Sequence, residues 1–303
     1  MRHPPTDLIV VGGFLGAGKT TLLNRLLTGP DGAGLGVVVN DFGAINIDEQ
    51  LVTARHGQVV SLANGCVCCD MGENLTDALF RLRELEAPPR TVVIEASGVA
   101  DPGRIAAVAQ VSRLFRLHAV VVLADAALVQ AHAADRYLAD TVLRQLRAAD
   151  LLVVNKADLV GPEEMEALAG WLDGVTRAPR VVTTEADLPL DLLLGATAPA
   201  SRAGTGDGGH AHFHSWSFAV DRPFNRAALG RVLDGLPVSV VRGKGLVVLS
   251  DAPEQRTVFH LVGRRWRFEG GGVPGAGSQL VLIGTGALPA NLDETFRSAL
   301  DGD

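Results

Sequence analysis

Cysteine is scarce in this chain of 303 residues, and its three copies fall within one tetrapeptide, at Cys66, Cys68 and Cys69. Such a cluster excludes a conventional disulfide framework, because that framework needs cysteines spread along the chain. A reducing compartment and metal binding by the thiols fit the spacing better. A vicinal disulfide acting as a redox switch is the alternative.

Long apolar runs and an excess of positive charge are also missing. The first apolar run, residues 8–11, is too short for a signal-peptide core or a membrane span. The 34 acidic and 27 basic residues give a net charge of −7, whereas nucleic-acid binding needs clustered lysine and arginine. The sequence therefore predicts a cytoplasmic protein that binds neither membranes nor nucleic acids.

Short apolar segments alternate with longer amphipathic segments in the first two thirds of the chain. The predicted strands, apolar on both faces as in buried parallel sheets, span residues 8–11, 37–39, 91–94, 119–123 and 151–154, with a possible sixth at 181–182. The helices predicted from helical spacing span residues 19–27, 74–85, 104–114, 137–148 and 163–172. This order predicts an α/β domain with a mostly parallel sheet over residues 1–195.

The pattern changes after that domain. Residues 196–211 are rich in small residues and lack periodicity, which predicts a flexible linker. Residues 212–303 are predicted to form a smaller α+β domain. Its strands are predicted at residues 212–220, 238–241, 245–250, 257–262, 266–269 and 279–283, and its helices at 225–233 and 292–300.

A phosphate-binding loop follows the first predicted strand. The pattern Gly-x-x-x-x-Gly-Lys-Thr is met by Gly13, Gly18, Lys19 and Thr20, and a helix follows, so backbone N–H groups can converge on an anion. Lys19 is expected to reach the β- and γ-phosphates and Thr20 to ligate Mg²⁺. The residues predicted to contact the nucleotide phosphates are Gly13, Gly16, Ala17, Gly18, Lys19, Thr20 and Thr21.

A guanine-reading motif follows the strand at residues 151–154. Asn155, Lys156 and Asp158 form Asn-Lys-x-Asp, in which the aspartate accepts from the N1–H and 2-amino groups of guanine. Adenine lacks both donors, and hydrogen bonds to charged groups contribute about 1.5–3 kcal/mol each. The motif thus predicts GTP rather than ATP.

Three further residues are candidates for the γ-phosphate end of this site. Glu95 ends the strand at residues 91–94 and is predicted to hold Mg²⁺ directly or through water, or to be a surface residue at a strand end. Gly98 can approach the γ-phosphate. Asp41, after the second strand, is the other candidate for the Mg²⁺ shell or for positioning the attacking water.

The three cysteines are the candidate metal site. Thiolates suit Zn²⁺ and other soft or borderline ions, and binding at neutral pH should release protons because free thiols have pKa near 8.5. Adjacent cysteines rarely all bind one tetrahedral ion, so two of them with a ligand from elsewhere is an alternative. His210, His212 and His214 alternate, so on a strand they would face one side. In the linker they could form a weak metal-collecting arm, or be incidental histidines of a solvated linker.

These motifs together resemble the CobW family of P-loop GTPases. The resemblance covers nearly the whole chain and rests on residues 12–24, 65–69, 95–98 with 101–102, 155–158, 242–245 and 280–284. It implies a Mg²⁺·GTP site at residues 13–21, a cargo site at the cysteines, and slow GTP hydrolysis coupled to metal delivery to a client protein. The chain departs from the family at Asp41 and Ala44, where the family usually has glutamates, which leaves Asp41 as the carboxylate for a metal in this segment.

Three hypotheses follow from the sequence. The first is a GTPase metallochaperone for zinc, with cobalt handling in cobalamin synthesis as an alternative cargo. The second is a nucleotide-responsive metal buffer or sensor without turnover. The third is an ATP-dependent kinase, against which the Asn155–Asp158 segment argues.

Overall fold

A computed structural model of the chain describes residues 4–29, 34–39, 58–61, 71–108, 112–188, 191–194, 213–273 and 276–301. The chain divides into two compact units. One comprises Met1–Arg177 with Val182–Ala196, and the other comprises Ala178–Val181 with Thr197–Asp303. The predicted linker, residues 196–211, lies outside the described residues and stays a prediction.

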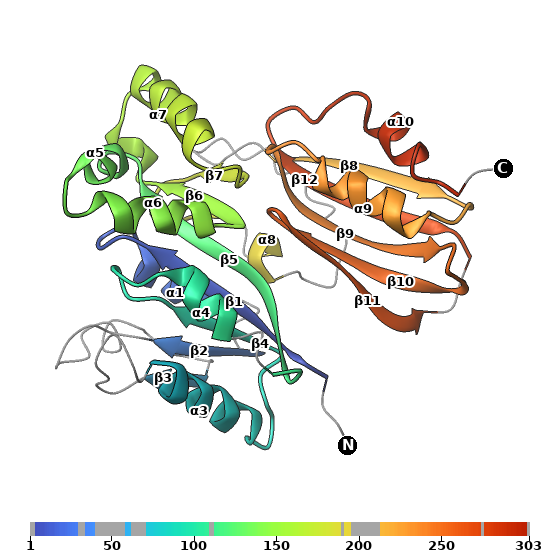
Figure 1. Cartoon of the computed structure of the whole chain (residues 1–303), viewed down its shortest axis with the longest axis horizontal. Coiled ribbons are helices and arrows are strands. Elements are labelled where there is room, and N and C mark those ends of the chain that lie inside the picture. Colours follow the sequence, from blue (N-terminus) through green and yellow to red (C-terminus); the bar gives the residue numbers. More distant parts are fainter. Residues whose placement is uncertain are drawn as a thin grey trace. The chain divides into compact units, whose positions relative to one another are not determined.

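A seven-stranded sheet organises the N-terminal part of the chain, in the order β3-β2-β4-β1-β5-β6-β7 (Figure 1). Its strands are β1 (Thr6–Gly13), β2 (Leu35–Val39), β3 (Gln58–Ser61), β4 (Thr91–Glu95), β5 (Phe115–Asp125), β6 (Leu151–Asn155) and β7 (Arg180–Val182). The pairings that join β3, β2, β4, β1, β5 and β6 are all parallel. The predicted α/β fold with a mostly parallel sheet is confirmed.

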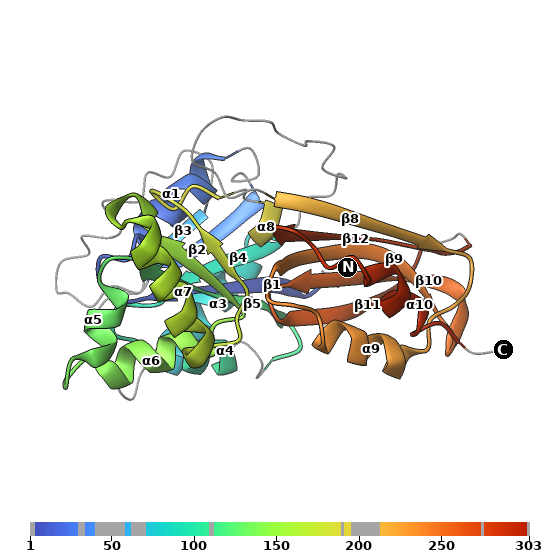
Figure 2. The ribbon, with the colours of Figure 1, turned by 90° about the horizontal axis from the view of Figure 1, so that it is seen from above.

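Helices cover both faces of this sheet. They are α1 (Lys19–Thr28), α3 (Met71–Arg83), α4 (Pro102–Val108), α5 (Val129–Ala134), α6 (Ala139–Ala148), α7 (Pro162–Val175) and α8 (Asp191–Leu194), with a 3₁₀ turn, η2 (Ala157–Leu159). Figures 1 and 2 show α1 on one face and α3, α4 and α6 on the other. This cover explains why β2 and β6 are buried along their whole length and read as continuous apolar runs.

The register of the strands gathers their carboxyl ends at one edge of the sheet. Val11 pairs with Glu95, Gly13 with Leu123, and Asp125 with Asn155. Because the strands are parallel, the loops that follow β1, β4, β5 and β6 leave the sheet at the same edge. In open α/β sheets this edge is where ligands bind.

Several elements in this part of the chain differ from the prediction in their bounds, and β3 was not predicted. The helix predicted over residues 104–114 is α4, which ends at Val108, and residues 113–114 form a turn. Strand β5 is longer than predicted because it pairs with β1 from Thr6 to Gly13. Strand β3 was not predicted, because four residues give too short a pattern to identify.

The second unit contains a five-stranded antiparallel sheet in the order β11-β10-β9-β12-β8. Its elements are β8 (Phe213–Val220), α9 (Arg226–Asp234), β9 (Val240–Leu249), β10 (Ala252–Val262), β11 (Arg265–Val273), β12 (Ser278–Thr285) and α10 (Leu292–Arg297). Helices α9 and α10 lie on the same side of the sheet (Figure 2). They bury Phe224, Phe259 and Phe296 in one apolar core. The predicted α+β character of this part is confirmed.

Strand β9 is continuous where the sequence predicted two strands separated by residues 242–244. Gly243 and Gly245 face the core, and a Cβ at Gly243 would lie 2.9 Å from the Phe259 ring and 2.8 Å from Leu282. The two glycines therefore make room for large neighbours and do not interrupt the strand. Since side chains alternate along a strand, Arg242 and Lys244 lie on the opposite face of the sheet.

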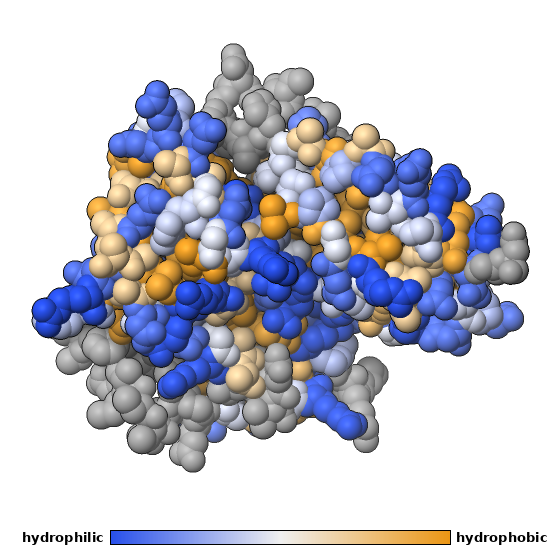
Figure 3. Space-filling view, turned by 45° about the horizontal axis from the view of Figure 1, so that its top comes forward, coloured by the Kyte–Doolittle hydropathy of each residue, from blue (hydrophilic) through white to orange (hydrophobic). Residues whose placement is uncertain are grey.

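Apolar and polar side chains are interspersed on the described surface shown in Figure 3. Leu15 and Leu159 are among the large apolar residues that reach the surface. Among the described residues, no helix combines the length and the apolar character needed to cross a membrane.

Candidate nucleotide site at the carboxyl edge of the sheet

The loop between β1 and α1 has a backbone that only glycine adopts readily. Gly13 has φ of +133°, and a Cβ there would lie 2.3 Å from the carbonyl oxygen of Leu123. Gly18, the N-cap of α1, has φ of +104° and no side-chain cap for the helix. The loop therefore presents the N-terminus of α1, with its backbone N–H groups and positive dipole end, at the edge of the sheet.

Lys19 lies across this loop and is almost fully buried. Its Nζ donates hydrogen bonds to the carbonyl oxygens of Gly13, at 3.0 Å, and Phe14, at 3.2 Å. The ammonium is thus held beside the N-terminus of α1. A phosphate oxygen would offer it a charged acceptor, which makes a stronger hydrogen bond than a neutral carbonyl.

Thr20 and Glu95 place two oxygen ligands beside the loop. The Thr20 hydroxyl donates to Glu95 Oε1 at 3.4 Å, and the glutamate is 2% exposed at the end of β4. A hydroxyl and a carboxylate are oxygen donors of the kind that Mg²⁺ prefers, so the residues present fit this ion. The alternative of a surface glutamate is wrong for Glu95, because it is buried. Asp41 lies outside the described residues.

Gly98 lies against the phosphate loop. A Cβ at Gly98 would come within 2.9 Å of the Leu15 backbone nitrogen, so this loop approaches the P-loop closely. The buried side chain of Gln145, on α6, donates to the carbonyl oxygens of Gly98 at 3.0 Å and Ala100 at 2.9 Å. Sequence reasoning missed Gln145, because a single glutamine on an amphipathic helix gives no signal.

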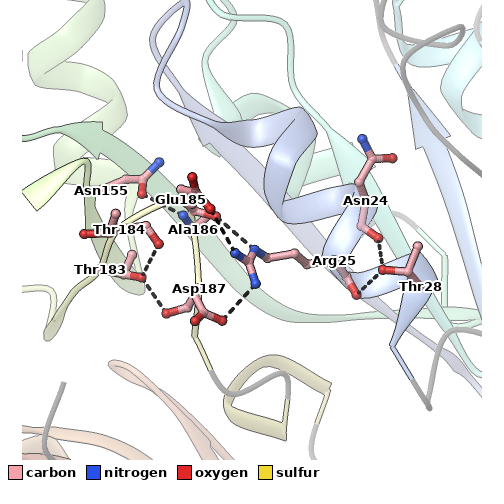
Figure 4. A network of polar contacts seen from close by, with 9 residues as sticks. All are labelled: Asn24, Arg25, Thr28, Asn155, Thr183, Thr184, Glu185, Ala186 and Asp187. Atoms are coloured by element: carbon pink, nitrogen blue, oxygen red, sulfur yellow. Dashed lines mark hydrogen bonds and ion pairs between the residues drawn. The ribbon is translucent and has the colours of Figure 1, made fainter. Parts of the chain in front are cut away.

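Asn155 joins the phosphate loop to the segment after β7. Its buried amide donates to the carbonyl oxygen of Ala17 at 2.9 Å, and its Oδ1 accepts from the N–H of Ala186 at 2.7 Å (Figure 4). Both ends of the side-chain amide therefore contact backbone groups. Asn155 therefore positions two loops, whereas Asp158 is exposed on η2 and presents its carboxylate to solvent.

Lys156 is held by a carboxylate that sequence reasoning missed. Its Nζ lies 2.7 Å from Oδ2 of Asp125, a buried residue at the end of β5. Lys156 also has φ of +61°, a left-handed conformation that is uncommon outside glycine. Asp125, like Glu95, directly follows an apolar run that forms a strand. This position in the sequence could have identified Asp125 as a candidate site residue.

The candidate metal ligands fall outside the described part of the chain. Cys66, Cys68, Cys69, His210 and His212 are not described, so the cysteine site stays a prediction. His214 is exposed on β8. Among the described residues, no three His, Cys, Asp or Glu side chains group in a way that could hold a metal ion.

Two family models match the chain along most of its length. The model for the CobW/HypB/UreG nucleotide-binding domain matches residues 7–183, more than half of the chain. The chain belongs to the CobW family of P-loop GTPases. The model for the cobalamin synthesis protein cobW C-terminal domain matches residues 213–300 of this CobW-family chain. The resemblance inferred from the sequence motifs is confirmed.

Curated CobW-family relatives include proteins named for zinc. Zinc chaperone YjiA of Escherichia coli is 35% identical over 199 residues, which cover 62% of this chain and 61% of YjiA. Zinc chaperone CobW of Pseudomonas aeruginosa is 30% identical over 303 residues, 85% of this chain and 80% of that protein. Zinc-regulated GTPase metalloprotein activator 1 of Dictyostelium discoideum is 26% identical and covers 84% of this chain.

Solved structures also match this CobW-family chain. The crystal structure of Zn(II)-bound YjiA GTPase from E. coli covers 98% of this chain and 99% of that chain, at 24% identity and a TM-score of 0.46. For two of the curated relatives, YjiA and a zinc chaperone CobW from Sinorhizobium, the match spans 61% of the relative's length.

Proposed function

We propose that this chain is a GTP-hydrolysing metallochaperone that binds zinc at its cysteine loop and delivers it to a client protein. The observation that carries the proposal is the P-loop, with the buried Lys19 ammonium and the Thr20–Glu95 oxygen pair at its edge. Membership of the CobW family supports GTP as the nucleotide. The names of the zinc chaperone relatives support zinc as the cargo.

In this proposal the described residues bind and orient GTP. Lys19 exchanges its two carbonyl acceptors for the β- and γ-phosphates, while the N-terminus of α1 receives the phosphates. Thr20 and Glu95 hold Mg²⁺, which neutralises charge that develops on the phosphate oxygens. The exposed carboxylate of Asp158 accepts from the N1–H and 2-amino groups of guanine.

The metal would be bound by thiolates of Cys66, Cys68 and Cys69, which a reducing cytoplasm keeps available. The strand register supports a link between this loop and the nucleotide. Val39 of β2 pairs both with Ser61, which ends β3 before the cysteine loop, and with Glu95. The chain enters the cysteine loop at the same sheet edge as Glu95, so a change at the γ-phosphate can alter metal affinity.

The experiment is GTP hydrolysis by the full chain with Mg²⁺, in buffers of defined free Zn²⁺ and, in parallel, free Co²⁺. We expect the rate to change with Zn²⁺ at sub-micromolar free metal and to remain unchanged with Co²⁺. A response to Co²⁺ alone would replace zinc with cobalt as the cargo. Negligible turnover with metal and candidate client present would favour the metal buffer or sensor and would contradict the proposed enzyme.

A further inference from the structure

Arg25 links the helix after the P-loop to a segment of the chain that is remote in sequence. It lies in the last turn of α1, and its Nε donates to the carbonyl oxygen of Glu185 at 2.9 Å (Figure 4). Its Nη1 donates to Oδ1 of Asp187 at 2.9 Å, and its Nη2 lies 3.6 Å from the Glu185 carboxylate. One guanidinium thus holds both a main-chain and a side-chain acceptor of the segment after β7.

The segment that Arg25 holds is strained. Glu185 and Ala186 have φ of +52° and +53°, so two consecutive residues with a Cβ adopt the left-handed conformation. This conformation is unfavourable for a residue with a Cβ, so it persists only where surrounding contacts impose it. Within the segment, Asp187 N–H donates to the carbonyl oxygen of Thr184 and the Thr183 hydroxyl donates to that of Asp187.

The strained segment adjoins the guanine-reading motif. Asn155 accepts the Ala186 N–H and donates to the P-loop, and the N–H of Ala157 donates to the Thr183 carbonyl oxygen at 3.1 Å. The segment is therefore fixed to η2, which carries Asp158, while Arg25 fixes it to α1. These contacts together set where the base-reading residues lie relative to the phosphate loop.

We propose that Arg25 is a positioning residue for guanine recognition. It holds the Thr183–Asp187 segment and, through this segment, keeps Asp158 at a fixed position relative to the P-loop. This inference rests on the proposed GTP site. Arg25 acts through the segment, so its loss should weaken binding of guanine nucleotides and leave the chemical step unchanged. Its ion pairs are solvent-exposed, with side chains 36% (Arg25) and 41% (Asp187) exposed. Such pairs contribute little to global stability.

The test compares Arg25→Met with Arg25→Lys and with Arg144→Met as a matched control. Arg144 forms an exposed ion pair with Asp140, one turn earlier on α6. Affinities for GDP, GTP, ADP and ATP are measured by competition with a fluorescent nucleotide, together with kcat, KM and the thermal midpoint. We expect Arg25→Met to weaken GDP and GTP binding about tenfold, to leave ADP and ATP binding unchanged and to keep kcat within about twofold.

Arg25→Lys should restore part of the guanine preference, and Arg144→Met should behave like the wild type. Asp187→Asn, which retains the segment but removes one charge, should shift the preference in the same direction as Arg25→Met. Equal losses for guanine and adenine nucleotides, or a fall in kcat at unchanged KM, would overturn the positioning role. A wild-type chain that binds GDP no better than ADP would instead overturn the proposed GTP site itself.

Discussion

At the residue scale, several polar side chains of the candidate site bind the backbone of neighbouring loops. Asn155 uses both ends of its amide on Ala17 and Ala186, and Gln145 donates to two carbonyl oxygens of the loop after β4. Buried polar groups of this kind fix loop geometry because leaving a buried acceptor without its donor costs about 1–3 kcal/mol. The motif residue Asn155 therefore contributes by fixing the positions of two loops, and in the proposed function it is Asp158 that contacts the base.

Gln145→Leu tests this argument for the loop that carries Gly98. The variant removes the donor to the Gly98 and Ala100 carbonyl oxygens at almost constant volume. We expect the free energy of unfolding to fall by about 1–3 kcal/mol. We also expect kcat for GTP to fall more than GTP affinity, because in the proposed site the affected loop lies next to the γ-phosphate.

Chemical denaturation and steady-state kinetics measure these two effects. Arg144→Met, on the solvent-exposed side of the same helix, is the control and should leave both unchanged. An unaltered kcat in a destabilised Gln145→Leu protein would mean that the glutamine supports packing and has no effect on hydrolysis.

At the element scale, the two sheets illustrate different sequence patterns. Strands of the parallel sheet are apolar on both faces because α1 covers one side and α3, α4 and α6 cover the other. Strand β9 alternates instead, with glycines toward the core and Arg242 and Lys244 on the opposite face. On that opposite face, Lys244 is the register partner of His260 on β10. His260 is in turn the register partner of Arg267 on β11.

Gly243→Ala tests why β9 contains glycine. The new methyl group would lie within 2.9 Å of Phe259 and Leu282, so the core must shift. We expect the second unit to lose about 1–3 kcal/mol of stability, the usual cost of overpacking. The measurement is denaturant unfolding followed by tryptophan fluorescence, since Trp216 and Trp266 lie in this unit.

Gly270→Ala on β11 is the matched control for this substitution. A Cβ at Gly270 would meet nothing within 4 Å, so this variant should keep the wild-type midpoint. Equal stability of the two variants would contradict the close-approach explanation.

His260 makes the stability of the second unit depend on pH. Burial, then the Arg267 cation, lower the pKa of His260 to about 4, with Arg242 and Lys244 adding to the effect and Glu269 opposing it. Between pH 6.5 and 4 the unfolded chain binds a proton on His260 that the folded chain does not. The contribution of His260 to the free energy of unfolding is therefore greatest above pH 6.5. It falls as the pH decreases towards 4, by at most about 1.4 kcal/mol per pH unit.

His260→Gln should reduce this slope, measured as unfolding midpoints between pH 7 and 4. His214→Gln, at an exposed position on β8 of the same sheet, is the control and should retain the wild-type slope. A His260→Gln protein whose stability falls as steeply as the wild type would assign the pH dependence to other groups.

At the scale of the whole molecule, the proposal requires that metal and nucleotide sites influence each other. Coupling of binding free energies is reciprocal, so zinc must change GTP affinity by the factor by which GTP changes zinc affinity. The double variant Cys66→Ser with Cys68→Ser should lose tight zinc binding, retain basal GTP hydrolysis and lose the response of that hydrolysis to zinc.

Calorimetric titration of each ligand in the presence and absence of the other measures the coupling. The cysteine variant supplies the uncoupled reference. Independent affinities in the wild type would contradict the switch mechanism. Wild-type zinc binding by the double variant would place the cargo site elsewhere, and the histidines at 210, 212 and 214 would be the next candidates.

The sequence alone determined the features that a contiguous segment encodes. The P-loop needs glycine at positions 13 and 18 because the backbone conformations there are unfavourable for other residues. The sequence motif therefore predicts the conformation of the loop. The alternation of apolar and amphipathic segments predicted the parallel sheet, since strands buried on both faces must be apolar throughout. The same motifs identified the family.

Only the tertiary structure decided the contacts between segments that are distant in sequence. Arg25 meets Asp187 and Gln145 meets the Gly98 loop because helices α1 and α6 pack against the sheet. Asp125 meets Lys156 because the parallel strands β5 and β6 bring their carboxyl ends together. Each partner is an ordinary polar residue on its own helix or loop, and no local pattern marks it. Their roles arise from burial and proximity, which the assembled sheet and its covering helices create.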